Sequence, residues 1–159
     1  MATTTASLTI TSSDLVGDAL SLSTTNTLNK AGNTAGLDQT TGMAKAYLTA
    51  TAAIDIFPAL VEDGDTASPA FEGKSSWVYI CNKSTDETEY ALITIGGINI
   101  GRLYGGDFLW MPWNMTKTAH ADNHHGDIEL APSVNTGMWF EWTCINEGTE
   151  WHAVDLAIS

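Results

Sequence analysis

Basic side chains are scarce in this chain. Of its 159 residues, 6 are Lys or Arg and 19 are Asp or Glu, so the formal net charge is -13. Proteins bind nucleic acids and anionic membranes largely through Lys and Arg, because these side chains neutralise phosphate groups. The sequence therefore argues against nucleic acid and membrane as partners. Its one-sided acidity also favours solubility and opposes non-specific association.

Long apolar segments and catalytic motifs are lacking as well. No stretch approaches the roughly 20 apolar residues that a membrane span needs, and residues 1–13 have neither a basic region nor an apolar run, so we expect no secretory signal. The sequence has no G-x-S-x-G motif, and the GGINIG segment at 96–101 lies inside a predicted hairpin and not before a helix. We therefore expect a protein that is not an enzyme and binds no cofactor.

Cysteine is limited to Cys81 and Cys144, with no Cys-x-x-Cys pair. This argues against zinc and redox chemistry. Both residues lie in apolar, strand-like runs, and we interpret them as two small buried thiols. A disulfide is the alternative, and it would require Cα atoms about 5.5 Å apart.

Aromatic residues are distributed unevenly along the chain. All six tryptophans lie in the second half: Trp77, Trp110, Trp113, Trp139, Trp142 and Trp151. Residues 1–51 are rich in Ser and Thr and contain one aromatic residue, Tyr47. Such a segment has little with which to bury a core of its own. We predict an extended N-terminal arm with short strands at 1–51 and a β-sandwich domain at 52–159.

Within the arm, apolar and hydroxyl residues alternate with a period of two. Leu8 and Ile10 alternate with Thr, and Leu20 and Leu22 alternate with Ser. This pattern predicts strands, each too short to fold alone. Residues 44–57 fit a strand or a short helix, and their Thr and β-branched content favours a strand.

The second half contains the clearest strand signals. Two β-rich runs flank Gly96-Gly97, which predicts a two-residue hairpin turn. Pro112 lacks an amide hydrogen, so its strand should lie at a sheet edge or end there. In residues 137–146, one strand face carries Phe140, Trp142 and Cys144, and we expect this face to point inward.

About six predicted strands follow residue 76 at intervals near ten residues, with a further short one in the tail. This spacing is typical of an antiparallel sandwich or a small barrel. We predict an all-β protein whose domain is an antiparallel, jelly-roll-like β-sandwich.

Two polar clusters are candidate metal sites. Ligands of a cupin-like site would be His120, His124, His125 and Glu129. Neighbours on a strand point to opposite faces, so His124 and His125 would not both bind one ion without a bulge. The acidic turn with Glu62, Asp63 and Asp65 lacks EF-hand spacing. We interpret both clusters as solvated loops and expect no metal.

Clustered aromatic residues make the candidate interface: Trp110, Pro112, Trp113 and Trp139. On a strand Trp110 shares a face with Pro112, while Trp113 lies with Met111. Exposed Trp beside Pro indicates a protein interface or a sugar-stacking platform. The alternative is a core Trp with a second Trp packed under the arm. We interpret Trp77 and Trp142 as core.

Two segments resemble small virion structural proteins of tailed bacteriophages. They are TITSSDLVGDALSLSTTNTLNKAGNTAGLDQTTGMAK, with its distinctive LDQTTG, and IGGINIGRLYGGDFLWMPWN. The His-rich stretch at 117–127 departs from that resemblance. The resemblance implies a non-enzymatic, β-rich particle component of the capsid decoration or fibre-like kind.

On this basis we expect a capsid decoration (cement) protein. Its partners would be the major capsid protein and copies of itself, as a dimer or trimer. It would lie on the capsid exterior after assembly in the host cytoplasm. The alternative is a receptor-binding or carbohydrate-binding β-sandwich at a tail or neck.

Overall fold

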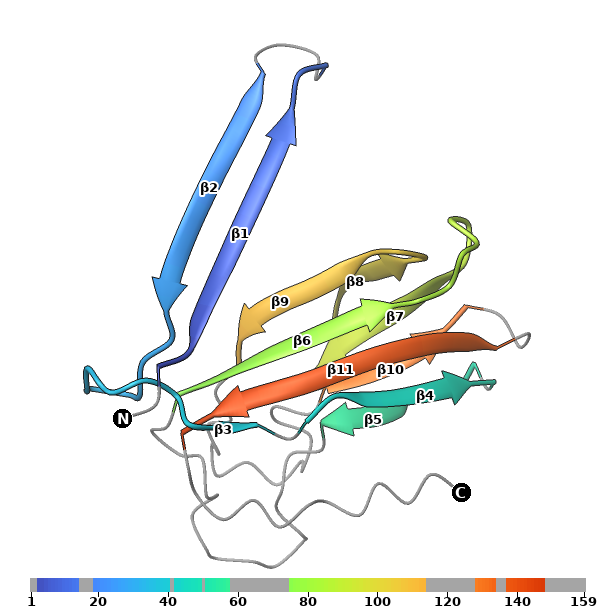
Figure 1. Cartoon of the computed structure of the whole chain (residues 1–159). Coiled ribbons are helices and arrows are strands. Elements are labelled where there is room, and N and C mark those ends of the chain that lie inside the picture. The colour runs from blue at the N-terminus through green and yellow to red at the C-terminus, as the bar shows by residue number, and fades with distance from the viewer. Residues whose placement is uncertain are drawn as a thin grey trace, which may run out of the picture.

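A computed structural model describes residues 3–14, 19–40, 42–49, 51–57, 75–113, 128–133 and 137–147. Every regular element in these ranges is a β-strand (Figure 1). The strands are β1 (Thr5–Ser12), β2 (Leu20–Thr27), β3 (Gln39–Thr40), β4 (Ala44–Leu48), β5 (Ile54–Phe57), β6 (Ser76–Asn82), β7 (Tyr90–Ile95), β8 (Ile98–Tyr104), β9 (Phe108–Pro112), β10 (Ile128–Pro132) and β11 (Met138–Asn146).

Nine of these strands form two antiparallel sheets that pack face to face. Sheet I has the order β3-β11-β6-β9, with β4 also paired to β11. Sheet II has the order β5-β10-β7-β8. Neither sheet closes on itself, so the domain is a sandwich and not the small barrel that the strand spacing also allowed.

Strands β4 to β11 follow a nested antiparallel pairing. β7 pairs with β8, β6 with β9, β5 with β10 and β4 with β11. The chain is thus one long hairpin wound around the core, with further pairs β6–β11 and β7–β10 completing the two sheets. This is a jelly roll, and it confirms the predicted fold class.

The turn between β7 and β8 is the innermost turn of this winding. Gly96 and Gly97 have φ angles of 56° and 77°, as a two-residue hairpin turn requires. L-residues rarely adopt such angles, so the two glycines explain why the chain reverses at this point. The predicted hairpin is confirmed.

The core lies between the two sheets and is almost entirely apolar. From sheet I it takes Phe140, Trp142 and Cys144, the inward face that alternation predicts. From sheet II it takes mainly aliphatic side chains: Ile56, Ala91, Ile93, Leu103, Ile128 and Leu130. The buried Asn82 amide donates a hydrogen bond to the Leu103 carbonyl at 3.0 Å and so links the sheets.

Strands β1 and β2 stand apart as a two-stranded hairpin, which we call the arm. Each pairs only with the other among the described strands, and the arm projects away from the sandwich (Figure 1). Its base is held by three hydrogen bonds that connect Thr4, Leu28 and Leu37 (2.7–2.8 Å). Leu28 and Leu37 are buried, so the arm is fixed where it leaves the domain.

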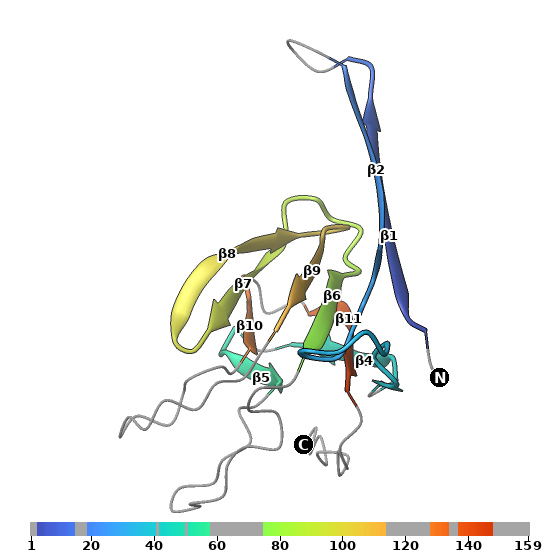
Figure 2. The same cartoon turned by 90° about the vertical axis from the view of Figure 1, so that its left-hand side faces the viewer.

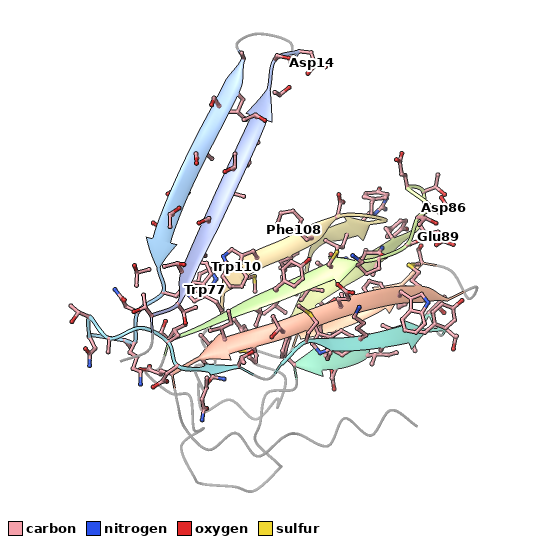
Figure 3. The ribbon with its side chains drawn as sticks, viewed as in Figure 1. Asp14, Trp77, Asp86, Glu89, Phe108 and Trp110 are labelled. Atoms are coloured by element: carbon pink, nitrogen blue, oxygen red, sulfur yellow. The ribbon has the colours of Figure 1, made fainter. Side chains whose placement is uncertain are left out.

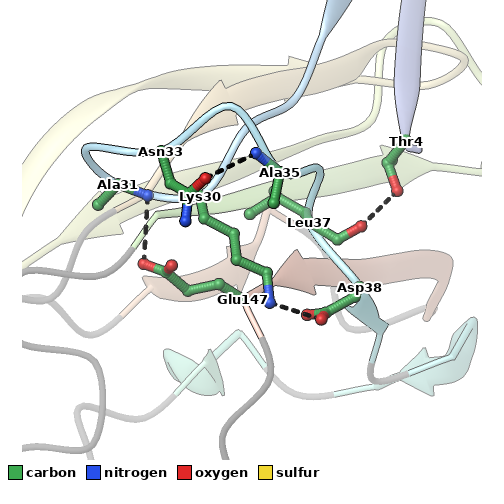
Figure 4. Close-up of polar contacts among 8 residues, drawn as sticks. All are labelled: Thr4, Lys30, Ala31, Asn33, Ala35, Leu37, Asp38 and Glu147. Carbon is green, nitrogen blue, oxygen red and sulfur yellow. Dashed lines mark hydrogen bonds and ion pairs between the residues drawn. The ribbon is translucent and has the colours of Figure 1, made fainter. Parts of the chain in front are cut away.

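A short segment after the arm is tied to the end of β11 (Figure 4). Lys30 pairs with Asp38 at 2.5 Å. The Glu147 carboxylate accepts a hydrogen bond from the Ala31 amide at 3.5 Å and one from the Ser75 amide at 2.6 Å. These contacts fix the base of the arm to sheet I.

Some expectations need correction. β3 and β4 lie before residue 52, yet both pair with β11, so the division at 51/52 does not coincide with the edge of the sandwich. Trp77 was expected in the core, but it lies half-buried on the outer side of sheet I. The final strand expected in the tail lies outside the described residues.

Adjacent residues of β11 provide a test of this arrangement. Phe140 is fully buried between the sheets, whereas Trp139 is 53% exposed on the outer side. Phe140→Ala should lower the free energy of unfolding by about 3–5 kcal/mol, because it leaves a cavity. Trp139→Ala should cost about 1 kcal/mol or less. Urea unfolding of both variants measures the difference, and a larger cost for Trp139→Ala would show that the sheet faces the other way.

Candidate interaction surface

The arm has two chemically different faces, which the β1–β2 register defines. Opposite residues of an antiparallel pair lie on the same side of the ribbon. One side, the hydroxyl face, carries only Ser and Thr: Thr5, Ser7, Thr9, Thr11, Ser21, Ser23, Thr25 and Thr27. The other side, the apolar face, carries Ala6, Leu8, Ile10, Leu20 and Leu22, with Ser12, Thr24 and Asn26 around them.

Hydroxyl groups on the hydroxyl face bond to one another across the strands. Ser7 and Thr25 are 2.9 Å apart, and Thr9 and Ser23 are 3.4 Å apart. These bonds satisfy part of the hydrogen-bonding capacity of the hydroxyl face and stabilise the strand register.

The large aliphatic side chains of the apolar face are exposed. Leu8, Ile10, Leu20 and Leu22 are 39%, 41%, 42% and 42% exposed. A two-stranded hairpin is marginal in water and gains stability when a further layer covers its apolar side. Contiguous exposed aliphatic side chains also indicate an interaction site. The apolar face therefore has the character of a contact surface.

Charge is absent from both strands of the arm. Residues 5–12 and 20–27 contain no Asp, Glu, Lys or Arg, in a chain with 19 acidic and 6 basic residues. The first charged residue toward the tip is Asp14 (Figure 3). Its carboxylate accepts a hydrogen bond from the Ser12 hydroxyl. A contact along these strands would bury no ionised group, which avoids a large desolvation cost.

Four aromatic side chains line the outer side of β6 and β9, and we call them the aromatic wall. They are Trp77, Tyr79, Phe108 and Trp110. Figure 3 labels Trp77, Phe108 and Trp110. The indole rings of Trp77 and Trp110 stack with centroids 5.2 Å apart and planes inclined by 25°. The rings of Tyr79 and Phe108 lie 6.2 Å apart. Because β9 is an edge strand, this wall lies at the rim of sheet I.

An open groove separates the arm from the aromatic wall. Its lining includes Leu8 and Ile10 on the arm side and Tyr79, Phe108 and Trp110 on the sheet side. Figure 2 shows the arm on the outer side of sheet I, away from sheet II. The apolar face of the arm thus faces the aromatic wall, and the two together form one uncharged surface.

Burial and a neighbouring thiol change the acidity of one wall residue. Partial burial raises the pKa of Tyr79 to about 12, and a hydrogen bond with the Cys81 side chain adds to the rise. The hydroxyl of Tyr79 therefore keeps its proton throughout the physiological range.

Charged groups on the outer side of sheet I gather on β4, β11 and the end of β6, beyond the aromatic wall. Glu141 pairs with Lys45 at 2.5 Å and with Lys83 at 3.7 Å. The hydrogen bond from Lys45 and the two positive charges lower the pKa of Glu141. The surface is thus divided into a charged part and an uncharged part, and the groove belongs to the uncharged part.

The structure separates the predicted interface residues. Trp110 and Pro112 lie on the outer face of β9, as their shared face predicts. Trp113 is 5% exposed and packs on Phe57 at 5.3 Å, so its expected place in an interface is wrong. Its backbone explains this, since the Trp113 amide and carbonyl both bond to Ser76 and turn the ring inward beside Met111.

Trp139 lies on β11, away from the groove, beside Tyr47 of β4. Their ring centroids are 5.2 Å apart and the planes are inclined by 47°. Gly137, with φ of 90°, leaves the space that the Tyr47 ring occupies. The two inclined rings do not form one flat platform.

Several residues of the surface were not predicted from the sequence. Phe108, Trp77 and Tyr79 belong to it, as does the apolar face of the arm. The alternation of Leu8, Ile10, Leu20 and Leu22 with Ser and Thr was the available signal, because it already placed all four on one side of a ribbon.

The two cysteines are thiols with no disulfide between them, on opposite sides of sheet I. Cys144 is fully buried between the sheets, and burial raises its pKa to about 12. Cys81 lies on the outer side of sheet I, opposite Glu141 of β11 and Phe108 of β9 in the strand register. The interpretation as two buried thiols is confirmed, and the disulfide alternative is wrong.

The described residues contain no group of three or more His, Cys, Asp or Glu that could hold a metal ion. Glu129 lies on β10, while His120, His124, His125 and the turn with Glu62, Asp63 and Asp65 lie outside the described residues. No helix among the described residues is long and apolar enough to cross a membrane.

No protein-family model matches the chain, and no curated protein matches it.

The shifted acidity of Tyr79 predicts a pH dependence of stability. Its pKa is about 12 in the folded chain and near 10 when unfolded. The folded state therefore keeps its proton longer, and the stability that this contributes is complete below pH 10 and lost as the pH rises toward 12. Cys144 adds to the same loss, since its pKa rises from 9 to about 12.

Tyr79→Phe should reduce this dependence. Urea midpoints of wild type and variant, measured on both sides of pH 10, should show a shallower alkaline decline in the variant. Equal slopes in the two proteins would contradict the assigned burial of the Tyr79 hydroxyl.

Proposed function

We propose that the chain is a structural component of a virus particle, a capsid decoration (cement) protein that binds the shell and stabilises it. The observation that carries the proposal is the arm: a fixed, uncharged ribbon that projects from a compact domain with its apolar face uncovered. A protein whose task is assembly needs such an element, since its apolar face is covered only in a complex.

The distribution of charge over the molecule agrees with this proposal. Acidic residues outnumber basic ones by 19 to 6, and the arm strands carry none of either. The sandwich thus presents an acidic surface that repels other proteins of the same sign, while the arm and the aromatic wall are free of that repulsion. In the proposed assembly the acidic sandwich faces solvent on the capsid exterior.

The resemblance to virion structural proteins of tailed phages supports the same proposal. The two segments that carry it overlap the surface described above. The first contains most of the arm and its anchored base, and the second contains the Gly96-Gly97 turn, β8 and β9, with Phe108 and Trp110 of the aromatic wall. Under this proposal the partners are the major capsid protein and other copies of the chain.

Binding to shells that lack the protein tests the proposal. Wild type should sediment with such shells in a saturable amount and raise their melting temperature. Leu20→Asp/Leu22→Asp should lose this binding, because two carboxylates on the apolar face would have to be desolvated in the contact. The matched control is Ile98→Asp, which changes a 69% exposed aliphatic residue on β8 in sheet II.

The control should bind as wild type does. Wild type that stays in the supernatant at saturating concentration would refute the proposal, and so would a Leu20→Asp/Leu22→Asp variant that binds normally.

A further inference from the structure

The two walls of the groove differ in their chemistry. The arm contributes aliphatic groups from Ala6, Leu8 and Ile10 and, nearer its base, the polar side chains of Thr5, Ser7, Thr24 and Asn26. The aromatic wall contributes ring faces together with two polar groups that are able to form hydrogen bonds, the Tyr79 hydroxyl and the Trp110 indole N–H. A matching occupant is a flat element with one aliphatic side and one side rich in hydrogen-bonding groups.

The arm is itself an element of this kind, with Leu and Ile on one face and eight hydroxyl groups on the other. We propose that two copies of the chain exchange arms, so that the arm of each lies in the groove of the other. Four layers then follow one another: the aromatic wall of one copy, the arm of the second, the arm of the first, and the aromatic wall of the second.

This order is consistent with two-fold symmetry. Each apolar face points toward its own aromatic wall, so the two apolar faces meet at the centre of the assembly. Each hydroxyl face then points toward the aromatic wall of the other copy. The contact is isologous, because the same surfaces are used on both copies. Because β-layers that pack face to face lie about 10 Å apart, one inserted ribbon requires the arm and the aromatic wall of the same copy to lie about 20 Å apart.

Electrostatics favour a second copy as the occupant. Two copies each carry a net charge of -13 and repel one another over most of their surface. They can approach closely only where acidic side chains are absent. The two arm strands and the aromatic wall have no charged residue, and they form the two sides of the groove. A strongly basic partner would gain more by binding the acidic sandwich.

This arm exchange rests on the proposed function in so far as the arm is the surface used for assembly. It is nevertheless tested on the purified chain with no shell present. A dimer that does not bind shells would support the arm exchange and refute the decoration role. A monomer that binds shells would support the decoration role and refute the arm exchange.

Sedimentation equilibrium of the full chain is the test. Protein interfaces of standard size have dissociation constants in the micromolar range or below, so we expect wild type to be a dimer at about 50 μM. Ile10→Asp, at the centre of the apolar face, should weaken the dimer at least about 100-fold, because a carboxylate would be buried between two arms. Ile98→Asp, the same change on exposed β8, should leave the dimer unchanged.

A second variant probes the other wall. Trp110→Ala removes an aromatic side chain from the groove and should also weaken the dimer. Near-ultraviolet circular dichroism of each variant shows whether the sandwich is still folded, since Trp113 and Trp142 lie in the core.

Three results would overturn the exchange. The first is a wild type that is monomeric at about 50 μM. The second is a dimer that persists in folded Ile10→Asp and Trp110→Ala variants. The third is an arm-dependent trimer in place of the dimer.

Discussion

The register of β11 in the middle of sheet I determines which side every neighbouring residue faces. β11 pairs with β4 along one edge and with β6 along the other, and β6 in turn pairs with β9. Because side chains alternate along a strand, placing Phe140 and Trp142 inside forces Trp139 and Glu141 outside. The same alternation, passed on through β6 and β9, places the aromatic wall on the outer surface. A slip of one residue would exchange the core and the interaction surface.

The sandwich and the arm are stabilised in different ways. The sandwich covers its own apolar residues between two sheets, and its nested pairing joins strands that are distant in the sequence, such as β4 with β11. The arm has one layer only, and its attachment depends on buried Leu28 and Leu37 and on contacts near Glu147. What the arm lacks is a covering layer, and the uncharged groove beside it is where we propose that a second arm supplies one.

Much of the sandwich could be predicted from local sequence pattern. Alternation placed Phe140, Trp142 and Cys144 on the inner face, and Gly96-Gly97 identified the central turn, because both signals lie within a few residues. Pairings such as β4 with β11 could not be predicted, since no local sequence pattern in either strand indicates its distant partner. Trp77 was misassigned because an unbroken apolar run does not show which side is inward. For Trp113 the pattern gave the correct companion, Met111, but not the direction of the shared face.

The central claim is that the apolar face of the arm is covered by assembly and not within one chain. Amide hydrogen exchange of residues 5–27, followed as the purified chain is diluted, tests this most directly. The account predicts that the arm amides exchange slowly in concentrated protein and quickly on dilution, while β6 and β11 exchange at the same rate throughout. Arm amides that remain protected in the most dilute, monomeric sample would contradict the account.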